Sequence, residues 1–191
     1  MNTLIIYAHP NPASFSSALK SKIEQTLIAK GDNVKVRDLY EMNFNSVLSA
    51  NDLAGVYAGN TPDDIVAEQE LISWANTIVM VYPIWWAGLP AIAKGYIDRV
   101  FTYGFAYKVG EQGIEGLLKG RNVILVTPHG TPKQYYEPSG MWNSMAQTQD
   151  KGIFEFCGIE VIKHFFLPMM GTEQTDREAY LNDVATYIKA I

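Results

Sequence analysis

The sequence contains only one cysteine, no apolar run long enough to cross a membrane, and fewer cationic than anionic side chains. A lone cysteine cannot form a disulfide within the chain, which excludes a disulfide-stapled secreted scaffold. Fifteen Lys and Arg against twenty Asp and Glu give a formal charge of -5, so we expect no general electrostatic grip on nucleic acid. The N-terminal segment MNTLIIYAHP lacks the basic start of a signal peptide. We therefore expect a cytoplasmic protein that is not embedded in a membrane.

Two common nucleotide-binding motifs are also missing. The chain has neither Gly-x-Gly-x-x-Gly nor Gly-x-x-x-x-Gly-Lys-[Ser/Thr], which disfavours a dinucleotide-binding Rossmann domain and a P-loop NTPase. What the chain does have is a globular composition, with 48% hydrophobic and 18% charged residues. We expect no metal site.

Short β-branched runs alternate with helical segments along the whole chain, which predicts one domain over residues 1–191. The predicted strands are Thr3–Ala8, Asn33–Leu39, Thr77–Tyr82, Asn122–Thr127 and Val161–Leu167. The predicted helices are Ser16–Ala29, Thr61 to about Ala75, Pro90–Phe101, Met141–Cys157, and a last helix opened by the capping box Thr175-x-x-Glu178. The segment Tyr40–Gly59 is predicted to be irregular.

Apolar strands that alternate with helices predict a doubly wound parallel α/β sheet with helices on both faces. Five strands favour the flavodoxin-like order 2-1-3-4-5 over a six-stranded dinucleotide fold. In such sheets ligands bind at the carboxyl ends of the strands, so the loops after the first, third and fourth strands are the candidates for a site.

The loop after the first strand, from His9 to Ser17, leads directly into a helix N-terminus, which suits a phosphate group. Ser14, Ser16 and Ser17 could donate hydrogen bonds there. Alternatively, Ser14 or Ser16 simply caps the helix.

The loop after the third strand carries two adjacent tryptophans, Trp85 and Trp86, between Pro83 and Pro90. Neighbouring side chains point in different directions, so at least one indole should lie in a cleft or at an interface, where it could form a flat wall for a ring. The alternative for each is a packing or dimer aromatic.

The loop after the fourth strand runs from Thr127 to Tyr136 and onward to Gly140. Its polar groups could bond the edge of a heterocycle, and Tyr135 and Tyr136 could donate to a developing anion or lie at the rim. His129 could equally be a solvated loop histidine. Elsewhere, Cys157 is expected to be a buried helix-end residue rather than a catalytic thiol.

Several stretches with a recognisable pattern occur in order along most of the chain: Ala8-His9…Ser14-Phe15, Asp38-Leu39-Tyr40-x-Met42-Asn43-Phe44-Asn45, Asp64-Ile65-Val66-Ala67-Glu68-Gln69, Pro83-x-x-Trp86-x-Gly88-x-Pro90-Ala91-x-x-Lys94-Gly95, Asp98-Arg99-Val100-Phe101, Gly104-Phe105-Ala106-Tyr107 and Phe156-Cys157-Gly158. Together they resemble the NAD(P)H:quinone oxidoreductase family, the DT-diaphorase-like members of the flavodoxin-like fold. Each stretch alone is weak, and the ordered set is specific.

The resemblance implies a noncovalently bound flavin, FAD or alternatively FMN, in a flavin-binding domain. Positions that would hold its phosphates and ribityl chain are matched by His9, Ser14, Phe15 and Ser16. The segment along the isoalloxazine ring is matched by Pro83, Ile84, Trp85 and Trp86. The segment at the pyrimidine edge of the ring is matched by Thr127, Pro128, His129 and Gly130, with Tyr135 nearby.

The resemblance further implies a ping-pong hydride transfer from NAD(P)H, through the flavin, to a quinone or similar flat acceptor. It implies a homodimer in which Tyr107 and Tyr103 close the partner's pocket. The family's charge-stabilising Tyr is matched by Tyr136, or by Tyr135 if no residue is inserted. Trp142, or Met141 without a gap, stands where the family has a His, so His129 is the expected substitute. Two alternatives stay open: a flavin-binding regulatory subunit of a membrane transporter, and a flavodoxin-type electron carrier.

Overall fold

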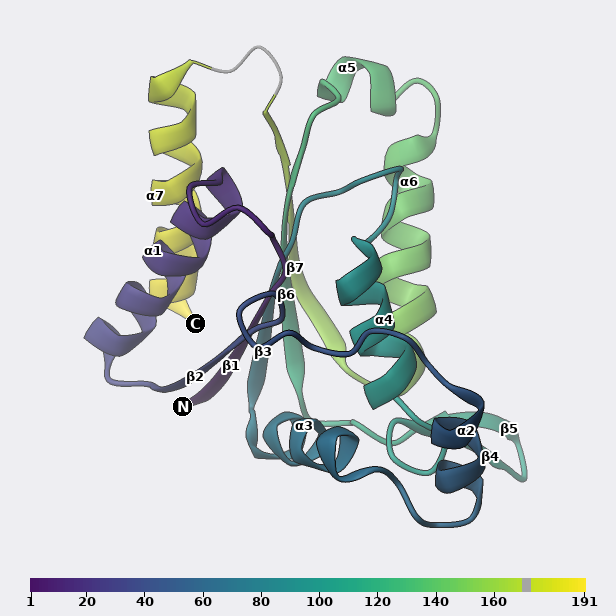
Figure 1. Ribbon diagram of the computed structural model, residues 1–191. Helices are drawn as coiled ribbons and strands as arrows, with labels where there is room; N and C mark the ends of the chain where they lie inside the picture. Colours follow the sequence, from purple (N-terminus) through teal and green to yellow (C-terminus); the bar gives the residue numbers. More distant parts are fainter. Residues whose placement is uncertain (170–172) are drawn as a thin grey trace.

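The computed structural model describes residues 1–169 and 173–191, and its centre is one parallel sheet of five strands. The strands are β1 (Asn2–Tyr7), β2 (Asn33–Asp38), β3 (Thr77–Val81), β6 (Asn122–His129) and β7 (Glu160–Pro168), in the order β2-β1-β3-β6-β7 (Figure 1). Because β6 and β7 are the fourth and fifth strands of this sheet along the chain, the predicted order 2-1-3-4-5 is confirmed.

Helices cover both faces of the sheet (Figure 1). One face packs against α1 (Phe15–Lys30) and α7 (Gln174–Ala190), and alternate strand residues such as Ile5, Val79 and Ile124 fill that core. The other face packs against α3 (Asp63–Trp74), α4 (Ala91–Val100) and the helical segment 141–157, which is described below. The central strands are apolar on both sides because both of their faces are covered.

The sequence pattern gives the ends of α1 almost to the residue. Ser14 is the N-cap, and its hydroxyl accepts a hydrogen bond from the Ser17 N–H at 3.2 Å. Gly31 ends the helix in the left-handed region at φ 89°, which glycine adopts without a steric penalty.

A helix and a two-stranded hairpin were not predicted from the sequence. The segment Tyr40–Gly59 is not wholly irregular, because it contains α2 (Ala50–Tyr57), which begins at a capping box formed by Ser49 and Asp52. The strands β4 (Tyr107–Gly110) and β5 (Gly113–Gly116) form a separate antiparallel hairpin. The hairpin strands are only four residues each and contain no buried residue, so no apolar run marks them.

Two predicted helix starts are wrong in detail. The N-cap of α3 is Pro62, which makes no side-chain cap, rather than Thr61. The last helix begins at a capping box formed by Glu173 and Asp176, not by Thr175 and Glu178. A carboxylate fills the cap role as well as a hydroxyl does, so the earlier acidic pair competes with the predicted one.

The predicted helix Met141–Cys157 is present but divided. It consists of α6 (Met141–Ala146), the π-helix η1 (Gln147–Phe154) and the short 3₁₀ turn η2 (Glu155–Cys157). A further single turn, α5 (Lys133–Tyr136), lies in the loop after β6. Among the helices in the described ranges, none is both long and apolar enough to cross a membrane.

Candidate functional site

The loop after β1 is held in one shape by its own polar groups. The Asn11 N–H donates to His9 Nδ1 at 3.0 Å, and the Asn11 side-chain oxygen accepts from the Ala13 N–H at 2.9 Å. Partial burial lowers the pKa of His9, so its ring is neutral at neutral pH. Because Nδ1 accepts a hydrogen bond, the neutral ring carries its proton on Nε2 and offers an N–H donor there.

The serines of this loop do different things. Ser14 caps α1, which confirms the alternative interpretation that this serine is a helix cap, and Ser16 is buried. Ser17 lines a pocket of 480 Å³ between the carboxyl ends of β1 and β2, together with His9 and Lys20. The first turn of α1 also leaves N–H groups without helical acceptors, and its partial positive charge favours an anion.

The loop after β3 is a tight hairpin that presents both tryptophans. Trp85 and Gly88 exchange backbone hydrogen bonds of 3.1 and 3.0 Å, and the two residues between them, Trp86 and Ala87, have φ of 52° and 59°. Left-handed backbone at two residues with side chains is costly and is found mostly where function requires it. The Trp86 indole is fully exposed, and Trp85, which is 42% exposed, packs edge-on against His9 with ring centroids 5.7 Å apart.

The loop after β6 is tied to the tryptophan hairpin, because the Ile84 N–H donates to the Pro128 carbonyl at 2.8 Å. His129 is only 3% exposed and is not the solvated histidine of the alternative interpretation. Its ring centroid lies 5.3 Å from that of Tyr136 and 5.9 Å from that of Trp142. Among the described residues, neither ring nitrogen of His129 has a hydrogen-bond partner of regular geometry. Burial lowers the pKa of His129, so this ring is also neutral at neutral pH.

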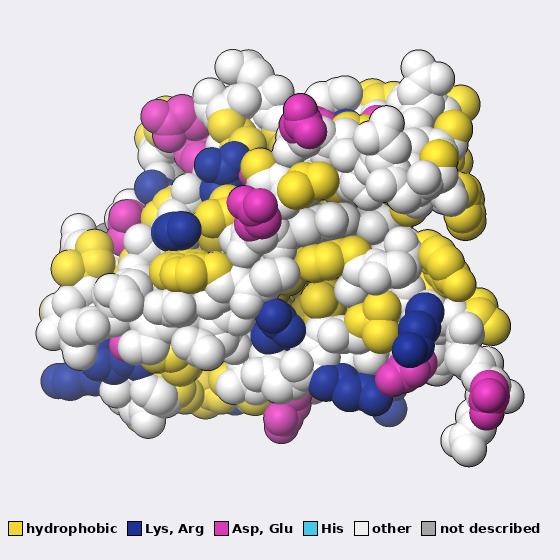
Figure 2. Space-filling view, turned by 90° about the horizontal axis from the view of Figure 1, so that it is seen from below, with side chains coloured by type: hydrophobic (Ala, Val, Ile, Leu, Met, Phe, Trp, Pro, Cys, Tyr) yellow, Lys and Arg dark blue, Asp and Glu magenta, His cyan; other side chains and the backbone are white. Residues whose placement is uncertain are grey.

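Tyr103 and Tyr107 lie elsewhere. They belong to the turn after α4 and to β4, at the end of the molecule opposite α5 (Figure 1). Figure 2 views the molecule from that opposite end, and no histidine side chain is visible there. Within one chain, these tyrosines are therefore separate from His9 and the tryptophan hairpin.

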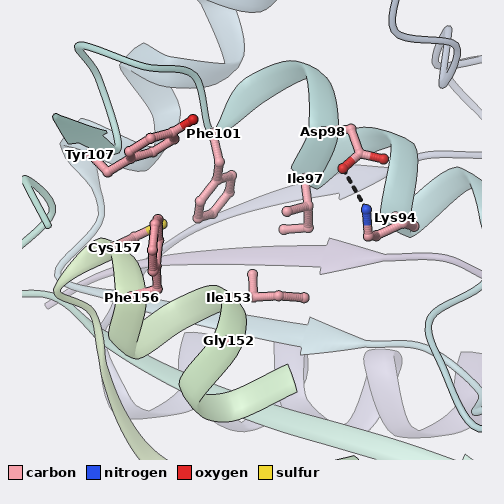
Figure 3. Close-up of a pocket in the computed structure, with 9 residues that line it drawn as sticks. All are labelled: Lys94, Ile97, Asp98, Phe101, Tyr107, Gly152, Ile153, Phe156 and Cys157. Atoms are coloured by element: carbon pink, nitrogen blue, oxygen red, sulfur yellow. Dashed lines mark hydrogen bonds and ion pairs between the residues drawn. The ribbon is translucent and has the colours of Figure 1, made fainter. Parts of the chain in front are cut away.

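Beside Tyr107, a groove with both apolar and charged lining separates α4 from the η1–η2 segment (Figure 3). It has a volume of 320 Å³, and the side chains of Ile97, Phe101 and Phe156 point into it. An exposed ion pair between Lys94 and Asp98, with an N–O distance of 2.5 Å, lies at the far end of the groove from Tyr107. Cys157 also lines the groove, and burial raises the pKa of its thiol to about 11, in agreement with the expectation of an unreactive helix-end residue.

The fold thus places the three loops along one edge of the sheet, and their chemistry fits a flavin. The α1 N-terminus, the His9 N–H and the nearby Lys20 suit phosphate oxygens. The exposed indoles suit a flat ring. The loops after β3 and β6 are open to solvent at their glycines, because an added Cβ at Gly88 or Gly130 would meet no atom within 4 Å.

Sequence reasoning missed Lys20 and Tyr7, which line the pocket beside His9. Lys20 lies on the turn of α1 that follows Ser16 and Ser17, so its spacing could have indicated it. Tyr7 carried no such signal, because it is the last apolar residue of a buried strand and its hydroxyl reaches the edge only in the folded sheet.

Comparison with known proteins matches residues 1–190 to a family model described as having a flavodoxin-like fold. An NAD(P)H oxidoreductase of Haemophilus influenzae, described as uncharacterized, is 44% identical over 85% of this chain and 81% of its own length. The ribosyldihydronicotinamide dehydrogenase [quinone] of Mus musculus is 33% identical over 83% of this chain and 78% of its own length. Among solved structures, the NAD(P)H:quinone oxidoreductase of Methanothermobacter marburgensis has a TM-score of 0.85 and 30% identity, covering 99% of this chain and 98% of its own.

Proposed function

Because this chain belongs to the NAD(P)H:quinone oxidoreductase family of the flavodoxin-like fold, we propose that it binds a flavin and reduces a quinone with two electrons from NAD(P)H. Membership of this family identifies the chain as an oxidoreductase. The observation that carries the proposal is the juxtaposition of the α1 N-terminus, the neutral His9 ring and the exposed tryptophan hairpin at one edge of the sheet.

We assign the phosphate end of the flavin to the loop after β1. The first N–H groups of α1, from Phe15 onward, and the Nε2 proton of His9 would donate to phosphate oxygens. The sequence prediction favours FAD, with FMN as the alternative. The pocket beside His9 supports FAD through its volume of 480 Å³, which gives room for a nucleoside next to Tyr40. Its charged lining does not distinguish the two flavins, because Lys20 is accompanied by the carboxylates of Asp38 and Glu41.

We assign the ring of the flavin to the segments Pro83–Trp86 and Thr127–Gly130, whose backbones are joined by the bond from Ile84 to Pro128. When bound, a flavin supplies the two-electron chemistry that links nicotinamide oxidation to quinone reduction. The exposed Trp86 indole forms one wall of a single flat slot, which NAD(P)H and the quinone would occupy in turn. One slot used twice predicts a ping-pong reaction.

We assign the stabilisation of charge beside that slot to Tyr136 and His129. Burial lowers the pKa of His129, so its ring adds no positive charge at neutral pH, and the Tyr136 hydroxyl can donate a hydrogen bond to a developing anion. Tyr135, which is 64% exposed, lies in the same turn. Trp142, which stands in place of the family's His, packs against the His129 ring and carries no transferable proton.

We propose that the enzyme is a homodimer in which Tyr103 and Tyr107 complete the partner's slot. Support comes from their distance from their own chain's site and from the exposed apolar side chains around them, which include Tyr57, Val109 and Phe156. Exposed apolar side chains that lie together are typical of a subunit interface. Light scattering should give twice the chain mass.

The test is the protein as purified. We expect a yellow protein whose chromophore, released by heat, has the mass of FAD or FMN. With NAD(P)H and a naphthoquinone, double-reciprocal plots at several quinone concentrations should be parallel. Trp86→Ala should raise the KM for the quinone about tenfold, whereas Ile28→Ala, an exposed apolar residue at the far end of α1, should change nothing. A folded protein that binds neither flavin contradicts the proposal.

A further inference from the structure

A buried histidine, His164 on β7, bridges the π-helix to the end of β6. Its Nδ1 lies 2.7 Å from a carboxylate oxygen of Asp150, and its Nε2 lies 2.9 Å from the hydroxyl oxygen of Thr127. The side chain of His164 is 5% exposed and Thr127 is completely buried. The mechanism proposed above uses neither His164 nor Asp150.

An irregularity of the sheet turns His164 to this side. Val123 pairs with Val161 but Ile124 pairs with Lys163, so Ile162 is an extra residue in β7. A shift of one residue moves every following side chain to the other face of a strand. Without the extra residue, His164 would point toward α1 and α7. The carbonyl of Ile162 accepts a hydrogen bond from the Tyr187 hydroxyl of α7 at 2.9 Å, which anchors the bulge.

A second irregularity, in the helix that faces β7, brings Asp150 to His164. Asp150 lies within η1, where the chain leaves the α-helical repeat for the wider π-helical one. π-helical turns are rare and often occur at functional sites. A bulge in a strand and a π-helix in the facing layer therefore meet at a single pair of side chains, Asp150 and His164.

The donors and acceptors of Asp150, His164 and Thr127 determine where the protons of these three side chains lie. The Asp150 carboxylate can only accept, so Nδ1 of His164 carries a proton. Burial lowers the pKa of His164, which leaves Nε2 without a proton at neutral pH. The Thr127 hydroxyl can then donate to Nε2. Its other acceptor within reach is the Phe165 carbonyl, at 3.0 Å.

Few other titratable groups face His164. From β6, His129 faces it, and the aromatic rings of Phe166 and Trp142 fill the space between the two histidines. Directly after β3, Tyr82 is completely buried, and burial, together with the charge of the nearby Asp150, raises the pKa of its hydroxyl. Lys163 lies on the opposite face of β7, over the Phe165 ring, and does not share this space.

We infer that Asp150 and His164 are positioning residues that act through Thr127 to fix the end of β6, from Thr127 to Gly130. The inference rests on the proposed function, because that segment is the one assigned to the polar edge of the flavin ring. Asp150 sets the tautomer of His164, the tautomer directs the Thr127 hydroxyl, and the hydroxyl holds the strand end in one conformation. The Thr127 hydroxyl is completely buried and lies within hydrogen-bond distance of His164 and the Phe165 carbonyl.

The test compares flavin affinity in matched variants, with FMN and FAD as probes and fluorescence quenching as the readout. Thr127→Val keeps the shape but removes the hydroxyl, and we expect it to weaken binding about three- to tenfold. Thr127→Ser keeps the hydroxyl and should bind within about twofold of the wild type. Thr3→Val is the control, because Thr3 is equally buried on β1 and its hydroxyl has no partner among the described residues. That variant should bind flavin as the wild type does.

A spectroscopic readout separates positioning from folding. Nitrogen NMR of the flavin-free wild type should show His164 protonated on Nδ1 and not on Nε2 at neutral pH, and Asp150→Asn should give a mixture of tautomers. A proton on Nε2 in the wild type, or equal flavin affinity in the wild type and Thr127→Val, overturns the inference. A wild type that binds neither flavin refutes the proposed function instead. If Thr127→Val does not fold, two other measurements test the inference. These are the His164 tautomer in the wild type and the flavin affinity of Asp150→Asn, which we expect to be several-fold weaker than that of the wild type.

Discussion

Replacing Arg99 by Met should destabilise the protein strongly, although Arg99 is not among the residues assigned to the flavin. Arg99, on α4, is 3% exposed and bonds the carboxylate of Asp52 at 3.1 and 3.3 Å. It also donates to the Asn45 carbonyl at 3.0 Å and to Asp64 at 2.7 Å. One guanidinium thus fastens α2 and the chain before it onto α3 and α4.

The size of the effect follows from what Asp52 loses. Removing one partner of a buried ion pair costs about 3–5 kcal/mol, because the other charge stays buried. The Asp52 carboxylate keeps one hydrogen bond, from the Ser49 N–H at 2.9 Å, which places the loss near the lower end. We expect Arg99→Met to lower the free energy of unfolding by about 3 kcal/mol, which for a chain of this length lowers Tm by about 8 °C.

Thermal and urea unfolding at neutral pH measure this change. Lys94→Met is the matched control on the same helix, because the ion pair of Lys94 with Asp98 is exposed and should contribute less than about 1 kcal/mol. The double variant Arg99→Met with Asp52→Asn should recover part of the loss, since it removes the unpaired charge. A loss below about 1 kcal/mol in Arg99→Met, or no recovery in the double variant, refutes the reasoning.

The same ion pair predicts the direction of a pH effect. Hydrogen bonding to Arg99 holds the pKa of Asp52 below its usual value despite burial. A carboxyl with a depressed folded-state pKa contributes its stabilisation fully above its unfolded pKa, and that stabilisation is lost as pH falls through the folded value. Acid should therefore narrow the difference in stability between Arg99→Met and the wild type.

Two further changes test other features of the fold. Because burial raises the pKa of Cys157 to about 11, a thiol reagent at mildly alkaline pH should label Cys157 only after unfolding, and rapid labelling of the native protein would contradict its placement. Gly95→Ala should destabilise by several kcal/mol, because a Cβ there would lie 2.1 Å from the Ser46 carbonyl oxygen, whereas at Gly88 it would meet nothing within 4 Å. Similar unfolding midpoints for Gly95→Ala and Gly88→Ala would show that the chain before α2 does not pack closely on α4.

The five strands of the sheet and the loops of the candidate site could be predicted because their signals are local. Apolar runs such as Ile78–Val81 mark strands buried on both faces, and the carboxyl ends of parallel strands necessarily share one edge. The exposure of the Trp85–Trp86 pair follows in the same way from the alternation of neighbouring side chains. By contrast, α2 carried a local signal, the capping box of Ser49 and Asp52, which the polar composition of its surroundings obscured.

The sequence alone determined the fold class, the edge of the sheet that bears the site and the family, since each depends on residue types at fixed spacing. Only the tertiary structure decided which polar groups meet. It paired Arg99 with Asp52 across 47 positions, buried His129, and turned His164 toward Asp150 through one extra residue in β7. The physical reason is that register and burial depend on contacts between distant segments, and a shift of one residue in a strand reverses the face of every side chain after it.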